Sequence, residues 1–101
     1  MLDKDLVEYL KEYHTTEQGA INSRELRCLF NLSDRELRIV VNRLRQEGNA
    51  ICSSSSGYWY SEDPSDIMIT LSRLEGQVKH MNLVIQGLKK IFAGGVQEHE
   101  E

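Results

Sequence analysis

Apolar residues recur at alternating intervals of four and three residues in the last third of the chain. They are Ile67, Leu71, Leu74, Val78, Met81, Ile85, Leu88 and Phe92. A stripe that repeats every 3.5 residues over more than three heptads is typical of a helix that pairs with another in a coiled coil. Leaving four such side chains in water would forgo about 1.5–3 kcal/mol each. The pattern therefore predicts one long helix that self-associates through residues 67–92.

The direction of this pairing stays open at the level of sequence. Val78 and Ile85 occupy a positions of the heptad, with leucine at the neighbouring d positions, which suits a parallel dimer. In a parallel register, however, the flanking pairs contain no opposite charges; they are Thr70/Glu75, Gln77/Asn82 and Val84/Lys89. An antiparallel pair or a helix bundle stays open as an alternative.

The first half of the chain predicts short helices. Residues 3–13 have one apolar stripe, and Ala20 and Ile21 could form a very short strand. Asn22 and Ser33 each precede a glutamate by three residues, the pattern of a capping box, so helices should begin at about residues 23 and 34. Gly48 suits the C-terminal cap of the second helix, and we expect Cys28 to be a small core residue.

The helical period stops after Gly48. Residues 51–60, ICSSSSGYWY, indicate a β-hairpin with its tip in the serine run at residues 53–56. Asp63 and Pro64 then predict the start of the heptad helix, since proline is well tolerated at a first helical position. That helix is expected to end at Phe92.

This order of elements resembles the winged helix-turn-helix family. The residues that carry the resemblance are NSRELRCLF–NL–SDRELRIVVNRLRQEG and the wing-like AICSSSSGYWYS, and it covers roughly residues 3–61. The wing followed by a heptad helix is similar to small proteins of phages and mobile elements. The resemblance implies an α+β, mostly helical fold: a winged helix-turn-helix domain over residues 1–61, a dimerisation helix over 62–93 and a flexible acidic tail over 94–101.

In that family the second helix of the tandem enters the major groove of DNA. At 100° per residue, the core side of residues 33–47 would hold Leu37, Val40, Val41 and Leu44. The opposite side carries side chains suited to reading bases, because arginine pairs with guanine, asparagine with adenine, and an apolar group with the thymine methyl. The predicted base-reading residues are Arg35, Arg38, Ile39 and Asn42.

Other residues are better placed for the DNA backbone. Arg43 and Arg45 lie later in the helix, and Ser23 and Arg24 begin the preceding one. The wing would offer only hydroxyls and amides, from Ser54 and Ser55, because its tip has no lysine or arginine. The expected phosphate contacts are therefore few, and non-specific binding should be weak and sensitive to salt.

Charge supports a local rather than a general cationic surface. The chain of 101 residues has a formal charge of −4, which excludes a polycationic protein. Residues 22–48 nevertheless hold six arginines (24, 27, 35, 38, 43, 45) against four acids (25, 34, 36, 47), a net charge of +2. The alternative interpretation is an ordinary solvated arginine face with glutamate partners.

Several classes of protein are not expected. No run of 18 apolar residues exists for a membrane span, and the charged N-terminus lacks the apolar core of a signal peptide, so we expect a cytoplasmic protein with reduced cysteines. We find no nucleophile–base pair and no phosphate-binding glycine loop, and therefore expect neither an enzyme nor a metal or other cofactor.

The sequence thus favours a dimeric, sequence-specific protein that binds double-stranded DNA. Its role would be that of a phage- or mobile-element-type transcriptional regulator or replication accessory. The alternative is a protein–protein interaction module in which the winged helix does not bind DNA. The negative net charge and the wing without basic residues motivate that alternative.

Overall fold

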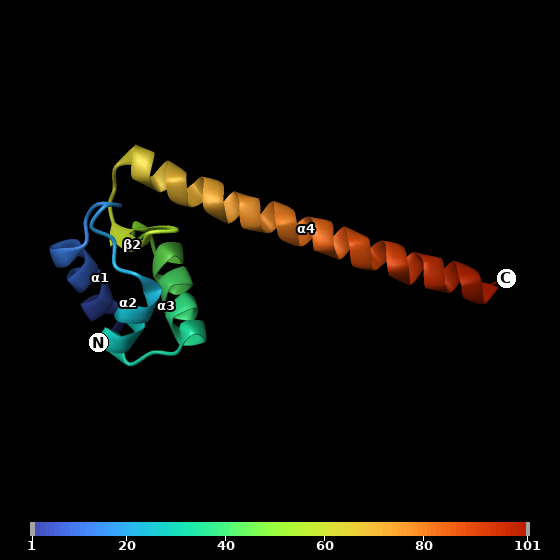
Figure 1. The fold of residues 1–101 in the computed structure, drawn as a ribbon, viewed down its shortest axis with the longest axis horizontal. Coiled ribbons are helices and arrows are strands. Elements are labelled where there is room, and N and C mark those ends of the chain that lie inside the picture. Colours follow the sequence, from blue (N-terminus) through green and yellow to red (C-terminus); the bar gives the residue numbers. More distant parts are fainter. Residues whose placement is uncertain (1, 101) are drawn as a thin grey trace. The chain divides into compact units, whose positions relative to one another are not determined.

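The structure is a computed structural model that describes the backbone of residues 2–100 and the side chains as far as residue 94. In chain order the elements are α1 (Leu2–Tyr13), α2 (Ser23–Phe30), α3 (Asp34–Gln46), β1 (Ile51–Ser54), β2 (Gly57–Tyr60) and α4 (Pro64–Glu100) (Figure 1). They divide into an N-terminal unit, Met1–Thr70, and a C-terminal unit, Leu71–Glu101. The predicted α+β, mostly helical class is confirmed.

The core of the N-terminal unit is formed by the three short helices and the hairpin. Its buried members are Leu6, Val7, Leu10, Ile21, Leu26, Leu37, Val40, Val41, Leu44 and Ile51. The four α3 residues in this set are the stripe that the sequence predicts, which is therefore confirmed. Cys28 is exposed, so its predicted core position is wrong. It lies two residues from the buried Leu26, and two residues turn a helix by about 200°.

The two predicted capping boxes differ in detail. Ser33 and Glu36 form a complete box: Ser33 Oγ accepts from the Glu36 amide at 3.1 Å, and Glu36 Oε1 accepts from the Ser33 amide at 2.8 Å. Asn22 Oδ1 likewise accepts from the Glu25 amide, but the Glu25 carboxylate takes its bond from the Asn22 side-chain amide instead of the backbone. An asparagine cap carries its own donor, so the second half of the box closes between side chains.

A residue with a left-handed backbone conformation follows each of the helices α2 and α3. Asn31 has φ 53°, and the next amide, of Leu32, donates back to the Arg27 carbonyl at 2.9 Å. Gly48 has φ 98° after α3, and the Asn49 amide donates to the Leu44 carbonyl at 3.0 Å. These are Schellman closures, so the predicted glycine cap is confirmed. They leave a connection of only residues 31–33 between α2 and α3.

The hairpin is tighter than predicted. β1 and β2 are antiparallel, with Cys52 opposite Trp59 and Ser54 opposite Gly57. Only Ser55 and Ser56 remain for the turn, whereas the sequence predicts a tip over residues 53–56. Ser53 and Ser54 join the strand because the register extends to Gly57, whose φ of 125° favours glycine.

The predicted short strand at Ala20 and Ile21 is a single bridge. Ile21 exchanges both backbone hydrogen bonds with Tyr58, at 2.9 and 2.8 Å, and the Tyr60 amide donates to the His14 carbonyl. A Cβ added to Gly57 would lie 2.2 Å from the Ile21 carbonyl oxygen. Gly57 is therefore required twice, for the turn and for this close approach.

The hairpin buries side chains on both faces. Ile51 faces the core cluster, while Cys52 and Trp59 form a buried cross-strand pair on the other face, as the alternation of a strand requires. The first turns of α4 belong to this same unit: the Ser53 amide donates to Thr70 Oγ1 at 2.9 Å, and Thr70 is buried. The N-terminal unit thus extends to Thr70, past the residue 61 at which the sequence suggests a boundary.

Helix α4 begins where the sequence predicts. Asp63 Oδ1 accepts from the Ser65 amide at 2.8 Å, with Pro64 at the first helical position. The helix continues past the expected end at Phe92 and reaches Glu100. Its backbone therefore includes most of residues 94–101, the segment expected as a flexible acidic tail. The side chains of residues 95–101 lie outside those that the structure describes.

Candidate nucleic-acid interface

The side of α3 that faces away from the core is exposed. Leu37, Val40, Val41 and Leu44 are buried, and the residues on the opposite side, Arg35, Arg38, Ile39, Asn42 and Gln46, are all exposed. We call Arg35, Arg38, Ile39 and Asn42 the α3 face. Ile39 is 48% exposed although it is a large apolar residue. The four predicted base-reading residues therefore lie together on a surface with no protein covering it in the N-terminal unit.

The two arginines of the α3 face differ in their partners. Arg38 forms an ion pair with Asp34, one turn earlier, at 2.6 Å, and both side chains are more than half exposed. Arg35 has no hydrogen bond or ion pair with any of the residues that the structure describes. Because an exposed pair contributes only about 0–1 kcal/mol, Arg38 can exchange Asp34 for another acceptor at little cost.

Arg43 connects two helices. Its Nε and terminal nitrogen donate to the two carboxylate oxygens of Asp3 in α1, at 3.0 and 2.9 Å. This bidentate pair fixes α1 against α3, and it also offsets the positive charge of Arg43. The sequence suggests Arg43 as a phosphate contact. The structure adds a packing role for Arg43. The sequence does not indicate this role, because Arg43 and Asp3 are forty residues apart.

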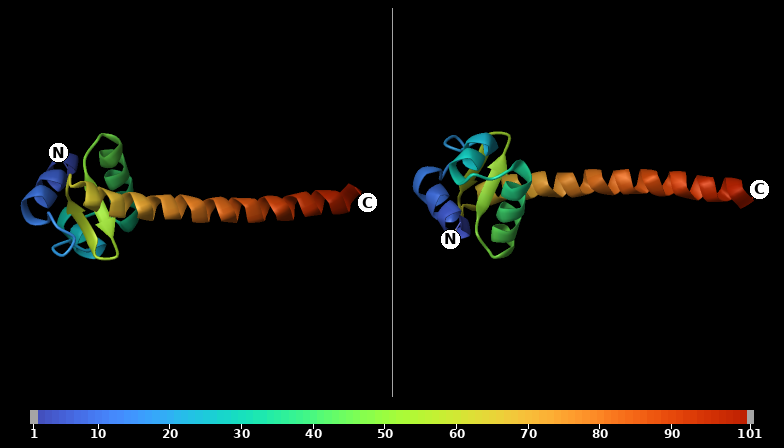
Figure 2. Two further views of the ribbon diagram at one scale, coloured as in Figure 1. Left: turned by 90° about the horizontal axis from the view of Figure 1, so that it is seen from above. Right: turned by 90° about the horizontal axis from the view of Figure 1, so that it is seen from below.

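Arg45 is half-buried and lies in α3, beside the hairpin. Figure 2 shows the hairpin next to α3. The Nε of Arg45 donates to the Ile51 carbonyl at 2.8 Å, and its terminal nitrogen donates to Ser53 Oγ at 2.9 Å. Arg45 and Thr70 both form hydrogen bonds with backbone groups on the edge of β1 that does not pair with β2. The sequence predicts that Arg45 contacts phosphate, and the geometry adds that Arg45 sets where the hairpin lies relative to α3.

The remaining predicted contacts surround the α3 face. Arg24 is exposed and Ser23 is half-buried at the start of α2. Ser55 is exposed in the hairpin turn, whereas Ser54 is half-buried and its Oγ accepts from the Ser56 amide at 3.0 Å. Ser54 therefore stabilises the turn, and Ser55 is the more available of the two serines.

Local electrostatics fix the start of α3. Hydrogen bonds from the Ser33 backbone and, to a smaller extent, the Ser33 hydroxyl lower the pKa of Glu36. The negative charge of ionised Glu36 also interacts favourably with the positive end of the helix dipole. This capping keeps the first turn ordered, and that turn carries Arg35.

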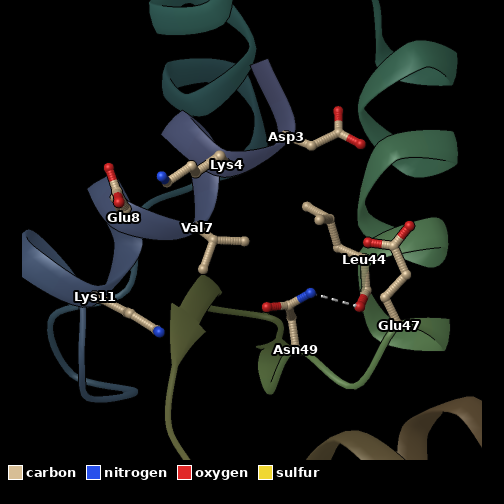
Figure 3. A pocket seen from close by; sticks show the side chains of 8 residues that line it. All are labelled: Asp3, Lys4, Val7, Glu8, Lys11, Leu44, Glu47 and Asn49. Atoms are coloured by element: carbon tan, nitrogen blue, oxygen red, sulfur yellow. Dashed lines mark hydrogen bonds between the residues drawn. The ribbon is translucent and has the colours of Figure 1, made fainter. Parts of the chain in front are cut away.

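A hollow of about 420 Å³ lies between α1 and the end of α3 (Figure 3). Its lining residues are Asp3, Lys4, Val7, Glu8, Lys11, Leu44, Glu47 and Asn49. Asn49 already donates to the Leu44 carbonyl at 3.0 Å, and Asp3 is engaged by Arg43. The lining includes both signs of charge and no serine, cysteine or histidine side chain. The hollow therefore gives no reason to prefer it over the α3 face as the functional site.

No helix among residues 2–100 is long and apolar enough to cross a membrane. No family model, curated protein or solved structure matches this chain. The functional interpretation therefore depends on the geometry of its own residues.

Proposed function

We propose that the protein is a dimeric winged helix-turn-helix protein that binds double-stranded DNA sequence-specifically. The observation that carries this proposal is the exposed α3 face, where Arg35 and Arg38 flank Ile39 and Asn42 opposite the buried stripe. An α-helix fits the major groove, and these side chains are the types that read guanine, thymine and adenine there.

The surroundings of α3 suit this docking. The short connection at residues 31–33 keeps α2 and α3 at a fixed angle, with Ser23 and Arg24 of α2 available for phosphate. Arg45 holds the hairpin beside the end of α3. A wing would lie at this position in a winged helix-turn-helix protein. Arg43 and Arg45 would lie close to the phosphates at the end of α3, and the turn would add a contact from Ser55.

The dimeric part of the proposal comes from α4. Its apolar stripe is largely exposed in the single chain: Val78 is 61%, Leu88 62% and Phe92 74% exposed. An exposed apolar strip of this length indicates a partner surface. Two copies would present two α3 helices to two half-sites, and joining them would raise their effective concentration on DNA. The role is then that of a phage- or mobile-element-type regulator or replication accessory in the cytoplasm, without catalysis.

Selection from random DNA duplexes tests this proposal. The full chain is incubated with the duplexes at low salt, and bound DNA is recovered and sequenced over successive rounds. We expect enrichment of one motif, with two related halves. If no duplex is enriched, the exposed faces serve protein contacts instead. The −4 charge and the wing tip without a basic residue favour that second candidate, a protein–protein interaction module.

A further inference from the structure

We propose that α4 pairs with α4 of a second copy in antiparallel orientation, with Glu75 of each copy beside Lys89 of the other. The inference rests on the dimer in the proposed function and specifies its partner and geometry. Both residues are exposed on α4 within the part of the chain that the structure describes. They flank the apolar stripe at e positions of the heptad.

The two orientations bring different flanking residues together. In a parallel pair, e positions face g positions of the partner, so Lys89 lies beside the apolar Val84 and Glu75 beside Thr70. In an antiparallel pair, e positions face e positions and g positions face g positions. Charge complementarity is therefore absent in the parallel pair and available in the antiparallel one.

One antiparallel register brings Glu75 and Lys89 of the two copies together. When Glu75 is set beside Lys89 of the second copy, symmetry repeats the ion pair at the other end. Asn82 then meets its own copy on the same side of the seam, and Val84 meets its own copy on the other side. Val84 is 44% exposed in the single chain, so this register covers apolar surface beside the main stripe.

The same register keeps the seam apolar over residues 74–92, and it leaves Ile67 and Leu71 outside these apolar layers. Each a position packs against a d position of the second copy, and the described layers are Leu74 with Phe92, Val78 with Leu88, and Met81 with Ile85. These layers place larger side chains opposite smaller ones. A parallel pair would instead put Phe92 against Phe92.

Neighbouring registers lose the charge match. A shift of one heptad in one direction sets Glu75 beside Asn82 of the second copy, and a shift in the other direction sets Asn82 beside Lys89. A shift of two heptads brings Glu75 against Glu75. The register that sets Glu75 beside Asn82 pairs all eight residues of the stripe, so the charge match, and not apolar coverage, favours the register with Glu75 beside Lys89.

Disulfide formation between cysteines introduced at two seam positions distinguishes the orientations. We would prepare Val78→Cys and Leu88→Cys separately, each with Cys28→Ser because Cys28 is exposed. In the proposed register, residue 78 of one copy lies about 15 Å along the axis from residue 78 of the other, too far for a disulfide. We expect little covalent dimer from either variant alone in a glutathione buffer, and a covalent dimer when the two are mixed.

A charge exchange gives a second test that keeps the seam intact. Lys89→Glu should weaken dimerisation about tenfold in analytical ultracentrifugation, because two ion pairs become two repulsions. Glu75→Lys with Lys89→Glu should restore it. Lys90→Glu is the matched control, since Lys90 lies at an f position away from the seam, and it should change dimerisation less than twofold.

Covalent dimers from each cysteine variant alone would show a parallel pair and overturn the inference. Equal weakening by Lys89→Glu and Lys90→Glu would do the same, as would a wild-type chain that stays monomeric at tens of micromolar. None of these readouts uses DNA. An antiparallel dimer that enriches no duplex would therefore keep this inference and contradict the proposed reading of DNA.

Discussion

Gly57 shows how a single residue position can depend on a contact that sequence alone does not reveal. A glycine before an aromatic run suggests a turn, and the φ of 125° agrees. The closer constraint is the Ile21 carbonyl, which leaves no room for a Cβ. The bridge between Ile21 and Tyr58 thus depends on the absence of a side chain at residue 57.

We predict that Gly57→Ala lowers the free energy of unfolding by about 2–4 kcal/mol, from backbone strain and displacement of the bridge. Gly48→Ala is the matched control. Gly48 also has positive φ, but nothing lies within 4 Å of its would-be Cβ, so about 1 kcal/mol is expected. Urea unfolding of both variants followed by circular dichroism measures the difference, and equal losses would contradict the role of the Ile21 contact.

Glu36 links the stability of the fold to pH. Its pKa is lowered in the folded chain by the hydrogen bonds to Ser33. A carboxylate with a lowered folded-state pKa stabilises the fold above its unfolded-state pKa, and this contribution is lost as the pH falls through the folded-state value. We therefore expect Glu36→Gln to reduce the loss of stability below about pH 4.5, the ordinary value for glutamate.

The measurement is urea unfolding of Glu36→Gln and wild type at pH 7 and at pH 3.5. Glu47→Gln, an exposed glutamate outside the box, provides the control. If both variants change the pH dependence equally, the box is not its source.

At the scale of elements, local signals predict more than long-range ones do. The capping residues Asn22 and Ser33 place the helix starts correctly, because a cap acts within three residues. The hairpin register and the position of Cys28 depend on what packs against them, so the tip and that residue are mispredicted. The α3 face is anticipated by helical periodicity, whereas the bonds of Arg43 to Asp3 and of Arg45 to Ile51 join segments that the sequence does not bring together.

We expect Arg45 to stabilise the fold as well as to position the hairpin beside α3. Arg45→Ala removes hydrogen bonds to the Ile51 carbonyl and Ser53 Oγ, and we predict a loss of about 1–2 kcal/mol. Arg24→Ala, at an exposed arginine, should change stability by less than about 0.5 kcal/mol. Thermal unfolding of the two variants compares them directly, and a loss at Arg24 as large as that at Arg45 would contradict the role of the hairpin bonds.

At the scale of the whole molecule, the chain combines a packed N-terminal unit with a helix whose apolar stripe is largely exposed among the described residues. The first unit offers the α3 face, and the second offers the part of α4 that begins at Leu71. The proposed function assigns DNA to the first and a second copy of the chain to the second. Each assignment can fail without the other.

The most direct test is a fluorescence anisotropy titration of the selected duplex. The variant Arg35→Ala/Arg38→Ala/Asn42→Ala should bind at least about a hundredfold more weakly, since each base contact contributes about 1–3 kcal/mol. Arg73→Ala/Lys79→Ala removes the same number of positive charges from exposed positions of α4, and it should bind nearly as the wild type does. Undiminished binding by the triple variant would contradict the assignment of α3 as the helix that reads DNA.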